Sequence, residues 1–215
     1  MKPILMLYLS TLILCFGIGV FCIKSFDKKI IYILIYVGIN IVIEIIGGYY
    51  LYFSTTKTII SHLYNYQAIL EIVLLGGYFQ MFLDSNFLKK IITFLKIGIP
   101  IIYLYFEFFS KQNQFANYQY FIISNFIFVI LSIVGFRQLL EKQEIINDPN
   151  FWIITGILFF NAGFFFLSGF INYISSKDLE LARKLFIINH LLNIIYYSLI
   201  TYGFICQRRL ARLLS

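Results

Sequence analysis

The amino-acid sequence predicts an all-α protein, a polytopic membrane bundle of seven transmembrane helices with almost no soluble part. Hydrophobic residues make up 60% of the 215 residues, and charged residues only 13%. A water-soluble domain needs a more charged surface than this composition provides, so most of the chain must contact lipid. The apolar residues also gather into runs of about 20, the length of helix that crosses about 30 Å of hydrocarbon.

Seven such runs follow one another along the chain, with short polar connections between them. The predicted helices cover approximately residues 3–23, 30–53, 64–82, 91–109, 118–136, 151–173 and 185–206. No connection is long enough to hold a folded domain. We therefore predict a single transmembrane domain over residues 1–215.

The first run is expected to stay in the protein as a helix. It is longer than the apolar region of a usual signal peptide, and no small-x-small cleavage site follows it. Lipoprotein processing is not expected either, because the bulky Leu14 and Phe21 precede Cys15 and Cys22, where a small residue would be needed.

The distribution of cations predicts the orientation. With seven spans, one side of the membrane holds six cations, namely Lys2, Lys57, Lys111, Lys177, Arg183 and Lys184. The other side holds ten, namely Lys24, Lys28, Lys29, Lys89, Lys90, Arg137, Lys142, Arg208, Arg209 and Arg212. Cytoplasmic segments carry an excess of Lys and Arg. We therefore expect an inner-membrane protein with its N-terminus outside and its C-terminus in the cytoplasm.

The sequence lacks the residues that several functional classes require. The net charge of +7 does not indicate nucleic-acid binding, because the cations are dispersed over short loops. The three cysteines lie in apolar runs without a CxxC motif, and neither HExxH nor GxxxxGK occurs. A retinal protein needs a lysine in the middle of the seventh helix, whereas Lys184 lies at its entrance. No catalytic residue, metal or cofactor is expected.

Ionisable side chains inside the predicted helices are the candidate functional residues, because a charge in hydrocarbon is costly. At about 1.5 Å per residue, Glu44, Glu71 and His190 lie roughly 13, 10 and 8 Å from the outer ends of their helices. Lys96 is a fourth such residue, but its long stem can reach the cytoplasmic interface. We expect the two glutamates and His190 to meet in one polar pocket in the outer half of the membrane.

Polar neighbours at helical spacing extend this predicted pocket. They are Asn40, Gln67, Asn189 and Asn193. The functional interpretation is a site for a proton or a small ligand, since desolvation favours the neutral form of a carboxyl group. The alternative interpretation is structural, with Asn, Gln and His forming interhelical hydrogen bonds and both glutamates neutral.

Three stretches of the chain resemble a known group of proteins. They are Asn65–Glu71 (NYQAILE), Phe151–Leu158 (FWIITGIL) and Ile188–Tyr196 (INHLLNIIY). In these stretches the chain is similar to small seven-helix membrane proteins of Bacteroidota. A glutamate in helix three and a His and an Asn in helix seven recur in that group, which matches Glu71, His190 and Asn193. The resemblance implies the seven-helix fold and no activity.

The expected function is that of a receptor-like or regulatory membrane protein. It would bind a small ligand or a partner through the pocket and act through another protein, because the chain has no soluble domain for signalling. Partner contacts would come from Arg208, Arg209 and Arg212, in a tail that is expected to continue helix seven along the anionic inner leaflet.

Two alternatives remain open. The first is a transporter or channel in which Glu44 and Glu71 carry protons or cations. Paired helix interruptions are usual in transporters, and Pro100 is the single mid-span proline, which weakens this alternative. The second is a membrane accessory protein of a defence system, for which no residue provides specific support.

Overall fold

The computed structural model describes residues 2–53, 57–109, 116–141, 145–175 and 177–214. Within these ranges the chain forms α-helices and one short 3-10 helix, and no strand. The elements are α1 (Lys2–Cys22), η1 (Ile23–Ser25), α2 (Lys28–Phe53), α3 (Lys57–Phe82), α4 (Asn86–Phe109), α5 (Ala116–Leu140), α6 (Pro149–Ser175) and α7 (Leu179–Leu214). The all-α class and the seven helices predicted from the sequence are confirmed.

α3 and α7 differ most from their predicted bounds. α3 begins at Lys57, seven residues before the predicted start, because a helix tolerates polar residues that end an apolar run. α7 begins at Leu179 and extends to Leu214, which confirms that the basic tail continues the seventh helix. Its 36 residues correspond to about 54 Å, well beyond the hydrocarbon thickness of about 30 Å.

Five helices are long and apolar enough to cross a membrane in the described ranges. Their apolar segments are Pro3–Ser25, Lys28–Tyr50, Ile122–Leu140, Pro149–Phe170 and Lys184–Leu213. α3 and α4 are not among the candidate spans of the described ranges. The chain is therefore a membrane protein with five candidate spans.

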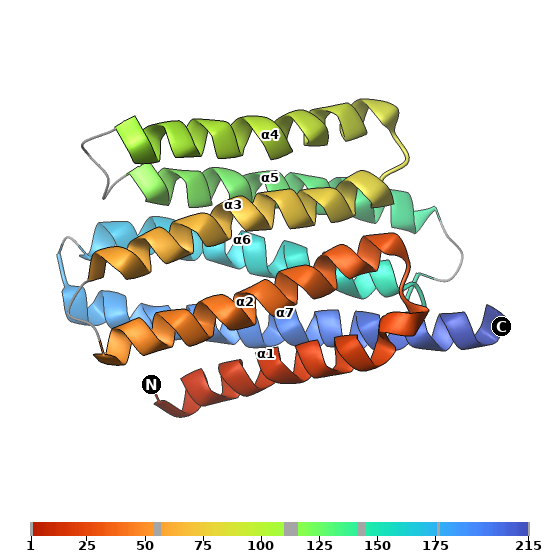
Figure 1. Ribbon diagram of the computed structural model, residues 1–215, viewed down its shortest axis with the longest axis horizontal. Helices are drawn as coiled ribbons and strands as arrows, with labels where there is room; N and C mark the ends of the chain where they lie inside the picture. The colour runs from red at the N-terminus through yellow and green to blue at the C-terminus, as the bar shows by residue number, and fades with distance from the viewer. Residues whose placement is uncertain (1, 54–56, 110–115, 142–144, 176, 215) are drawn as a thin grey trace. The chain divides into compact units, whose positions relative to one another are not determined.

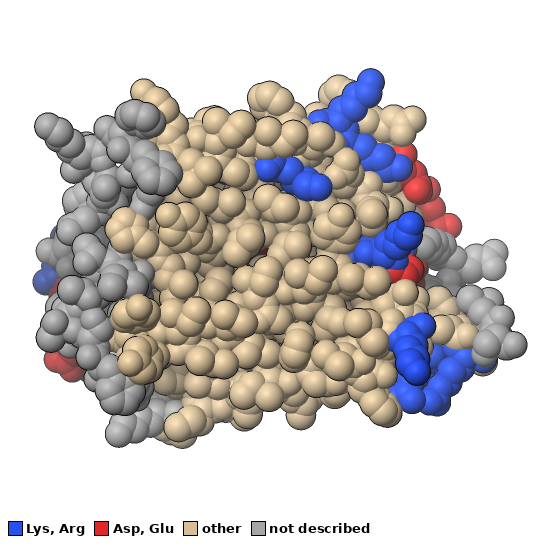
Figure 2. Space-filling view, viewed as in Figure 1, with Lys and Arg blue, Asp and Glu red and all other residues tan. Residues whose placement is uncertain are grey.

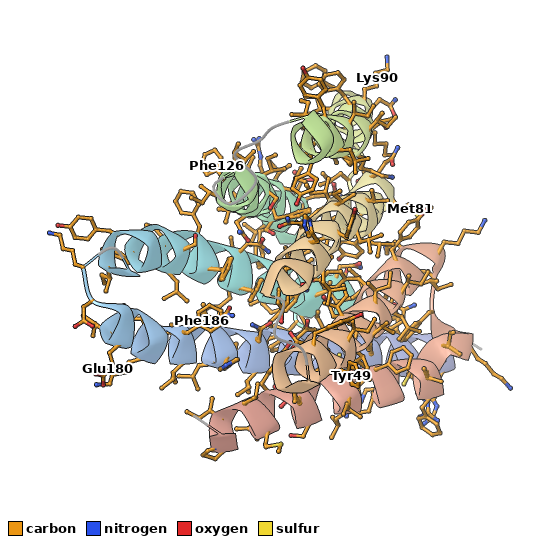
Figure 3. All side chains as sticks on the ribbon, turned by 60° about the vertical axis from the view of Figure 1, so that its left-hand side comes forward. Tyr49, Met81, Lys90, Phe126, Glu180 and Phe186 are labelled. Carbon is orange, nitrogen blue, oxygen red and sulfur yellow. The ribbon has the colours of Figure 1, made fainter. Side chains whose placement is uncertain are left out.

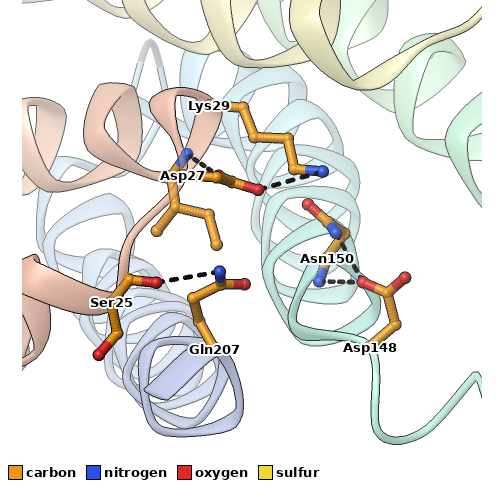
Figure 4. A network of polar contacts seen from close by, with 7 residues as sticks. Ser25, Asp27, Lys29, Asp148, Asn150 and Gln207 are labelled. Atoms are coloured by element: carbon orange, nitrogen blue, oxygen red, sulfur yellow. Dashed lines mark hydrogen bonds and ion pairs between the residues drawn. The ribbon is translucent and has the colours of Figure 1, made fainter. Parts of the chain in front are cut away.

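Acidic residues begin several helices. The carboxylate of Asp27 accepts a hydrogen bond from the backbone N–H of Ile30 in the first turn of α2, at 3.0 Å. Asp148 does the same for Asn150 in α6, at 2.8 Å (Figure 4). Asp178 accepts from two N–H groups at the start of α7. These caps satisfy donors that helix geometry leaves free, and they set the helix starts.

The described chain divides into two compact units. Unit 1 contains residues 1–26 and 122–215, and unit 2 contains residues 27–121. Unit 1 thus holds α1, η1, most of α5, α6 and α7, whereas α2, α3 and α4 form unit 2 (Figure 1).

In unit 1, α7 packs against α6 and α1. Glycines permit the close approach of α6 and α7. A Cβ atom on Gly203 would lie 3.1 Å from the carbonyl oxygen of Pro149, and one on Gly163 would lie 2.6 Å from a methyl group of Leu192. Small residues allow helix backbones to approach closely in membranes. The Gly203 contact with Pro149 and the Gly163 contact with Leu192 show that the two helices are antiparallel.

In unit 2, α2, α3 and α4 form two consecutive antiparallel hairpins. The ring of Tyr32 on α2 covers Gly77 of α3, where a Cβ atom would lie 2.5 Å from the ring. On the other side of α3, the stem of Lys96 covers Gly76, and its ammonium group donates to the side-chain oxygen of Gln80 at 3.0 Å. In each hairpin, a long side chain of one helix thus packs against a glycine of α3.

The outer surfaces of the helices are apolar. Figure 3 shows side chains such as those of Tyr49, Met81, Phe126 and Phe186 projecting from their helices, each more than 40% exposed. Uncharged residues cover most of the face drawn in Figure 2. Exposed apolar surface of this extent is suited to contact with a lipid bilayer.

Candidate functional site

Polar side chains connect α2 and α3 along one line inside unit 2. Gln67 of α3 donates its Nε2 to the Oδ1 of Asn40 on α2, at 2.5 Å. One turn away, the Tyr36 hydroxyl of α2 donates to Oε1 of Glu71 on α3, at 3.4 Å. The Asn40 amide also donates to the backbone carbonyl of Tyr36, at 3.0 Å. We call these four residues, Tyr36, Asn40, Gln67 and Glu71, the α2–α3 polar seam.

The helical repeat explains why these residues face one another. Tyr36 and Asn40 are four residues apart on α2, and Gln67 and Glu71 are four apart on α3, so each pair lies on one face. Because the helices are antiparallel, the first residue of one pair meets the second of the other. Each cross-helix bond is thus one turn from the next.

Glu71 is the most isolated member of the seam. Its side chain is 7% exposed, in the middle of a helix. Among the described residues, the Tyr36 hydroxyl is its one hydrogen-bond donor, and 3.4 Å is long for an O–H···O bond. A buried carboxyl group has two oxygens that can accept several hydrogen bonds. This carboxyl group can therefore take a proton or accept a donor group from a bound molecule.

Glu44 lies on α2 at another level of the same hairpin. Its carboxylate interacts electrostatically with the Tyr64 hydroxyl of α3, which also lies against Gly47. Glu71 is instead level with Tyr36, eight residues before Glu44, which corresponds to about 12 Å along the helix. Because α3 starts seven residues before its predicted start, Glu71 lies about 21 Å from the start of the helix.

His190 lies on α7 in unit 1, among aromatic rings. Its imidazole stacks on Tyr8 of α1, with ring centroids 5.6 Å apart, and meets Phe186 edge-on at 5.9 Å. Nδ1 is buried and has no hydrogen-bond partner among the described residues. The convergence of His190 with Glu44 and Glu71 stays a prediction, because those two residues belong to unit 2.

Asn189 and Asn193 pair within α7. The Nδ2 of Asn193 donates to the backbone carbonyl of Asn189 at 2.9 Å and to its side-chain oxygen at 3.2 Å. Both of these bonds stay inside α7. The arginines of the predicted partner contact lie at the other end of α7, where Arg208 stacks on Phe21 and Arg209 is exposed.

Two functional candidates were missed from the sequence, Tyr36 and Tyr8. Tyr36 precedes Asn40 by one turn, so the helical stripe that contains Asn40 and Glu44 also contains Tyr36. That signal is weak in a chain with 17 tyrosines. Tyr8 has no signal in its own helix, because it meets His190 only through tertiary packing.

Other sites in the described chain offer fewer polar groups for binding a ligand. An apolar groove of about 320 Å³ runs along α6 and includes Thr155, Phe159 and Leu192. The Thr155 hydroxyl is already bonded to the carbonyl of Phe151, so the groove lacks a polar group to orient a ligand. No group of His, Cys, Asp or Glu in the described ranges could hold a metal ion. The three cysteines are buried thiols.

Comparison with known proteins adds no relative: no protein-family model, no curated protein and no solved structure matches this chain.

Proposed function

We propose that this protein is a receptor-like or regulatory membrane protein whose ligand site is the α2–α3 polar seam. The observation that carries the proposal is the isolation of Glu71, a carboxyl group 7% exposed with one long hydrogen bond. Ionisable residues at membrane depth are rare and mark functional sites by default. A small molecule with an amine or hydroxyl donor would complete the hydrogen bonding of Glu71.

The other seam residues favour a small polar ligand. The neighbouring bond from Gln67 to Asn40 holds α2 and α3 together without help from Glu71. The Glu71 carboxyl group is therefore not needed to connect the two helices, because the amides of Asn40 and Gln67 already do so. Because the described part of the chain contains no soluble domain, binding would be relayed through another protein.

The seven-span topology belongs to the same proposal. α2 is a candidate span, and α3 packs along it from the Tyr32–Gly77 contact to the Gly47–Tyr64 contact. α3 therefore shares the depth of α2, and its polar residues are covered by the hairpin. With α4 also crossing, the N-terminus lies outside and the C-terminus in the cytoplasm of the inner membrane.

The test compares Glu71→Gln with a matched control, Gln80→Ala, which alters α3 outside the seam. The full chain is purified with its native lipids, and native mass spectrometry measures any small molecule that is retained. We expect the wild type and Gln80→Ala to retain the same molecule, and Glu71→Gln to lose it while keeping its helical circular dichroism. Equal retention by all three proteins would contradict the proposal.

A transporter is the second candidate, because a lone intramembrane carboxyl group can also carry a proton. Vesicles that contain the full chain and a trapped pH-sensitive dye distinguish the two. A receptor leaves an imposed pH gradient unchanged, in the wild type as in Glu71→Gln. Dissipation of the gradient by the wild type but not by Glu71→Gln would favour transport over reception.

A further inference from the structure

The C-terminal end of α7 extends past the end of α1. α1 and α7 run in the same direction, since Tyr8 of α1 meets Tyr197 of α7 and, later in both helices, Phe21 meets Arg208. α1 ends at Cys22 and passes into η1. The side-chain amide of Gln207 donates to the carbonyl of Ser25 in η1, at 3.1 Å (Figure 4). Gln207 is therefore level with the end of α1.

Seven residues of α7 follow Gln207, which corresponds to about 10 Å of helix. They carry three arginines, Arg208, Arg209 and Arg212, and the exposed Lys24 of η1 lies at the same end of unit 1. No acidic residue follows Glu180 in the sequence.

Apolar side chains alternate with these cations. Leu213 is 83% exposed and Leu210 39% exposed, and their spacing of three residues places them on one helix face. Phe21, 71% exposed, supports the guanidinium group of Arg208, whose carbon lies 4.2 Å from the ring centroid. A helix end with cations on one side and exposed leucines on the other is suited to the boundary between headgroups and acyl chains.

Two carboxylates of the described residues, those of Glu141 and Asp148, lie at this end of unit 1. α5 is antiparallel to α6, as the contacts of Phe126 with Phe165 and of Phe136 with Phe151 show, so Glu141 lies at the same end. The Asp148 carboxylate bonds the backbone and side-chain amides of Asn150. Among the described residues, this end of unit 1 thus holds five cations, Lys24, Arg137, Arg208, Arg209 and Arg212, and two carboxylates, Glu141 and Asp148.

We propose that the α7 basic end, defined as Lys24, Arg208, Arg209, Leu210, Arg212 and Leu213, binds anionic phospholipid headgroups. The level of Gln207 places the cations at the membrane surface, where anionic lipids attract them. The two leucines enter the bilayer beside the arginines. A docked protein would instead need Leu213 to be covered by protein and withdrawn from lipid.

The experiment reports directly on the lipids beside residue 213. Trp152 is the one tryptophan of the chain, so Leu213→Trp in a Trp152→Phe background provides a single fluorophore. The full chain is reconstituted in equimolar phosphatidylcholine and phosphatidylglycerol, with a nitroxide near the glycerol backbone of either lipid. The ratio of the two quenching efficiencies measures which lipid surrounds the tail.

We expect labelled phosphatidylglycerol to quench about twofold or more above its share of the bilayer, and this preference to disappear in Arg208→Gln/Arg209→Gln/Arg212→Gln. The matched control, Lys177→Gln/Lys184→Gln, removes cations at the other end of unit 1 and should keep it. Circular dichroism checks that all variants are folded. Equal quenching by both lipids in the parent protein would overturn the proposal. Quenching by neither lipid would also overturn it and leave a protein partner as the occupant.

Discussion

The hydrogen bond between Asn40 and Gln67 should have a measurable coupling energy across α2 and α3. Asn40 is 1% exposed, and its Oδ1 accepts from the Gln67 amide while its own amide donates to the Tyr36 carbonyl. Asn40→Ala leaves the Gln67 amide without this acceptor, so we expect a loss of about 1–3 kcal/mol in the free energy of unfolding. Gln67→Ala should cost less, because Asn40 keeps its bond to Tyr36.

The coupling energy is obtained from the two single variants and the double variant. Interhelical hydrogen bonds in a membrane protein average about 0.6 kcal/mol and reach about 1.7 kcal/mol, and this range is the expected coupling. Unfolding by sodium dodecyl sulfate in bicelles, followed by circular dichroism, gives each value. Gln67→Ala with Gln80→Ala is the control cycle: 13 residues, about 20 Å, separate them on α3, so their effects should add. A coupling below about 0.3 kcal/mol for Asn40 and Gln67 would refute the bond.

Two further predictions concern packing and topology. Gly203→Ala places a Cβ atom 3.1 Å from the Pro149 carbonyl and 2.8 Å from Ile153, and should destabilise the protein by about 1–3 kcal/mol in the same unfolding assay. Gly169→Ala, which has no atom within 4 Å of the new Cβ, should be neutral or stabilising; an equal loss from both would show that α6 and α7 do not pack as closely as described. Reporter fusions should place the C-terminus in the cytoplasm and the N-terminus outside. High activity of a C-terminal alkaline phosphatase fusion would show that the protein has the opposite orientation.

The number and approximate positions of the helices could be predicted from the sequence alone. A bilayer requires about 20 apolar residues per span and satisfied backbone groups, so hydropathy directly indicates helices. The prediction was less accurate at the ends. Polar residues such as Lys57 and His62 lower the hydropathy at the start of α3, but they do not prevent backbone hydrogen bonding there.

Helical periodicity also identified the polar face of each helix, but not its partner. The stripe with Asn40 and the stripe with Gln67 were each visible in the sequence, and the two residues do bond across the helices. Nothing in a single stripe indicates its vertical register against another helix, which is why Glu71 was expected level with Glu44 and lies level with Tyr36. Tertiary packing sets that register, through contacts such as Gly77 against Tyr32.

The roles of individual polar residues depended on the tertiary structure for the same reason. In the sequence, Asn193 and Asn40 have similar surroundings, because each is an asparagine one helical turn from an ionisable or polar residue. In the structure Asn193 bonds within its own helix, whereas Asn40 receives a bond from α3. An amide can bond either along its helix or across to another, and the choice depends on which side chain packing brings within about 3 Å.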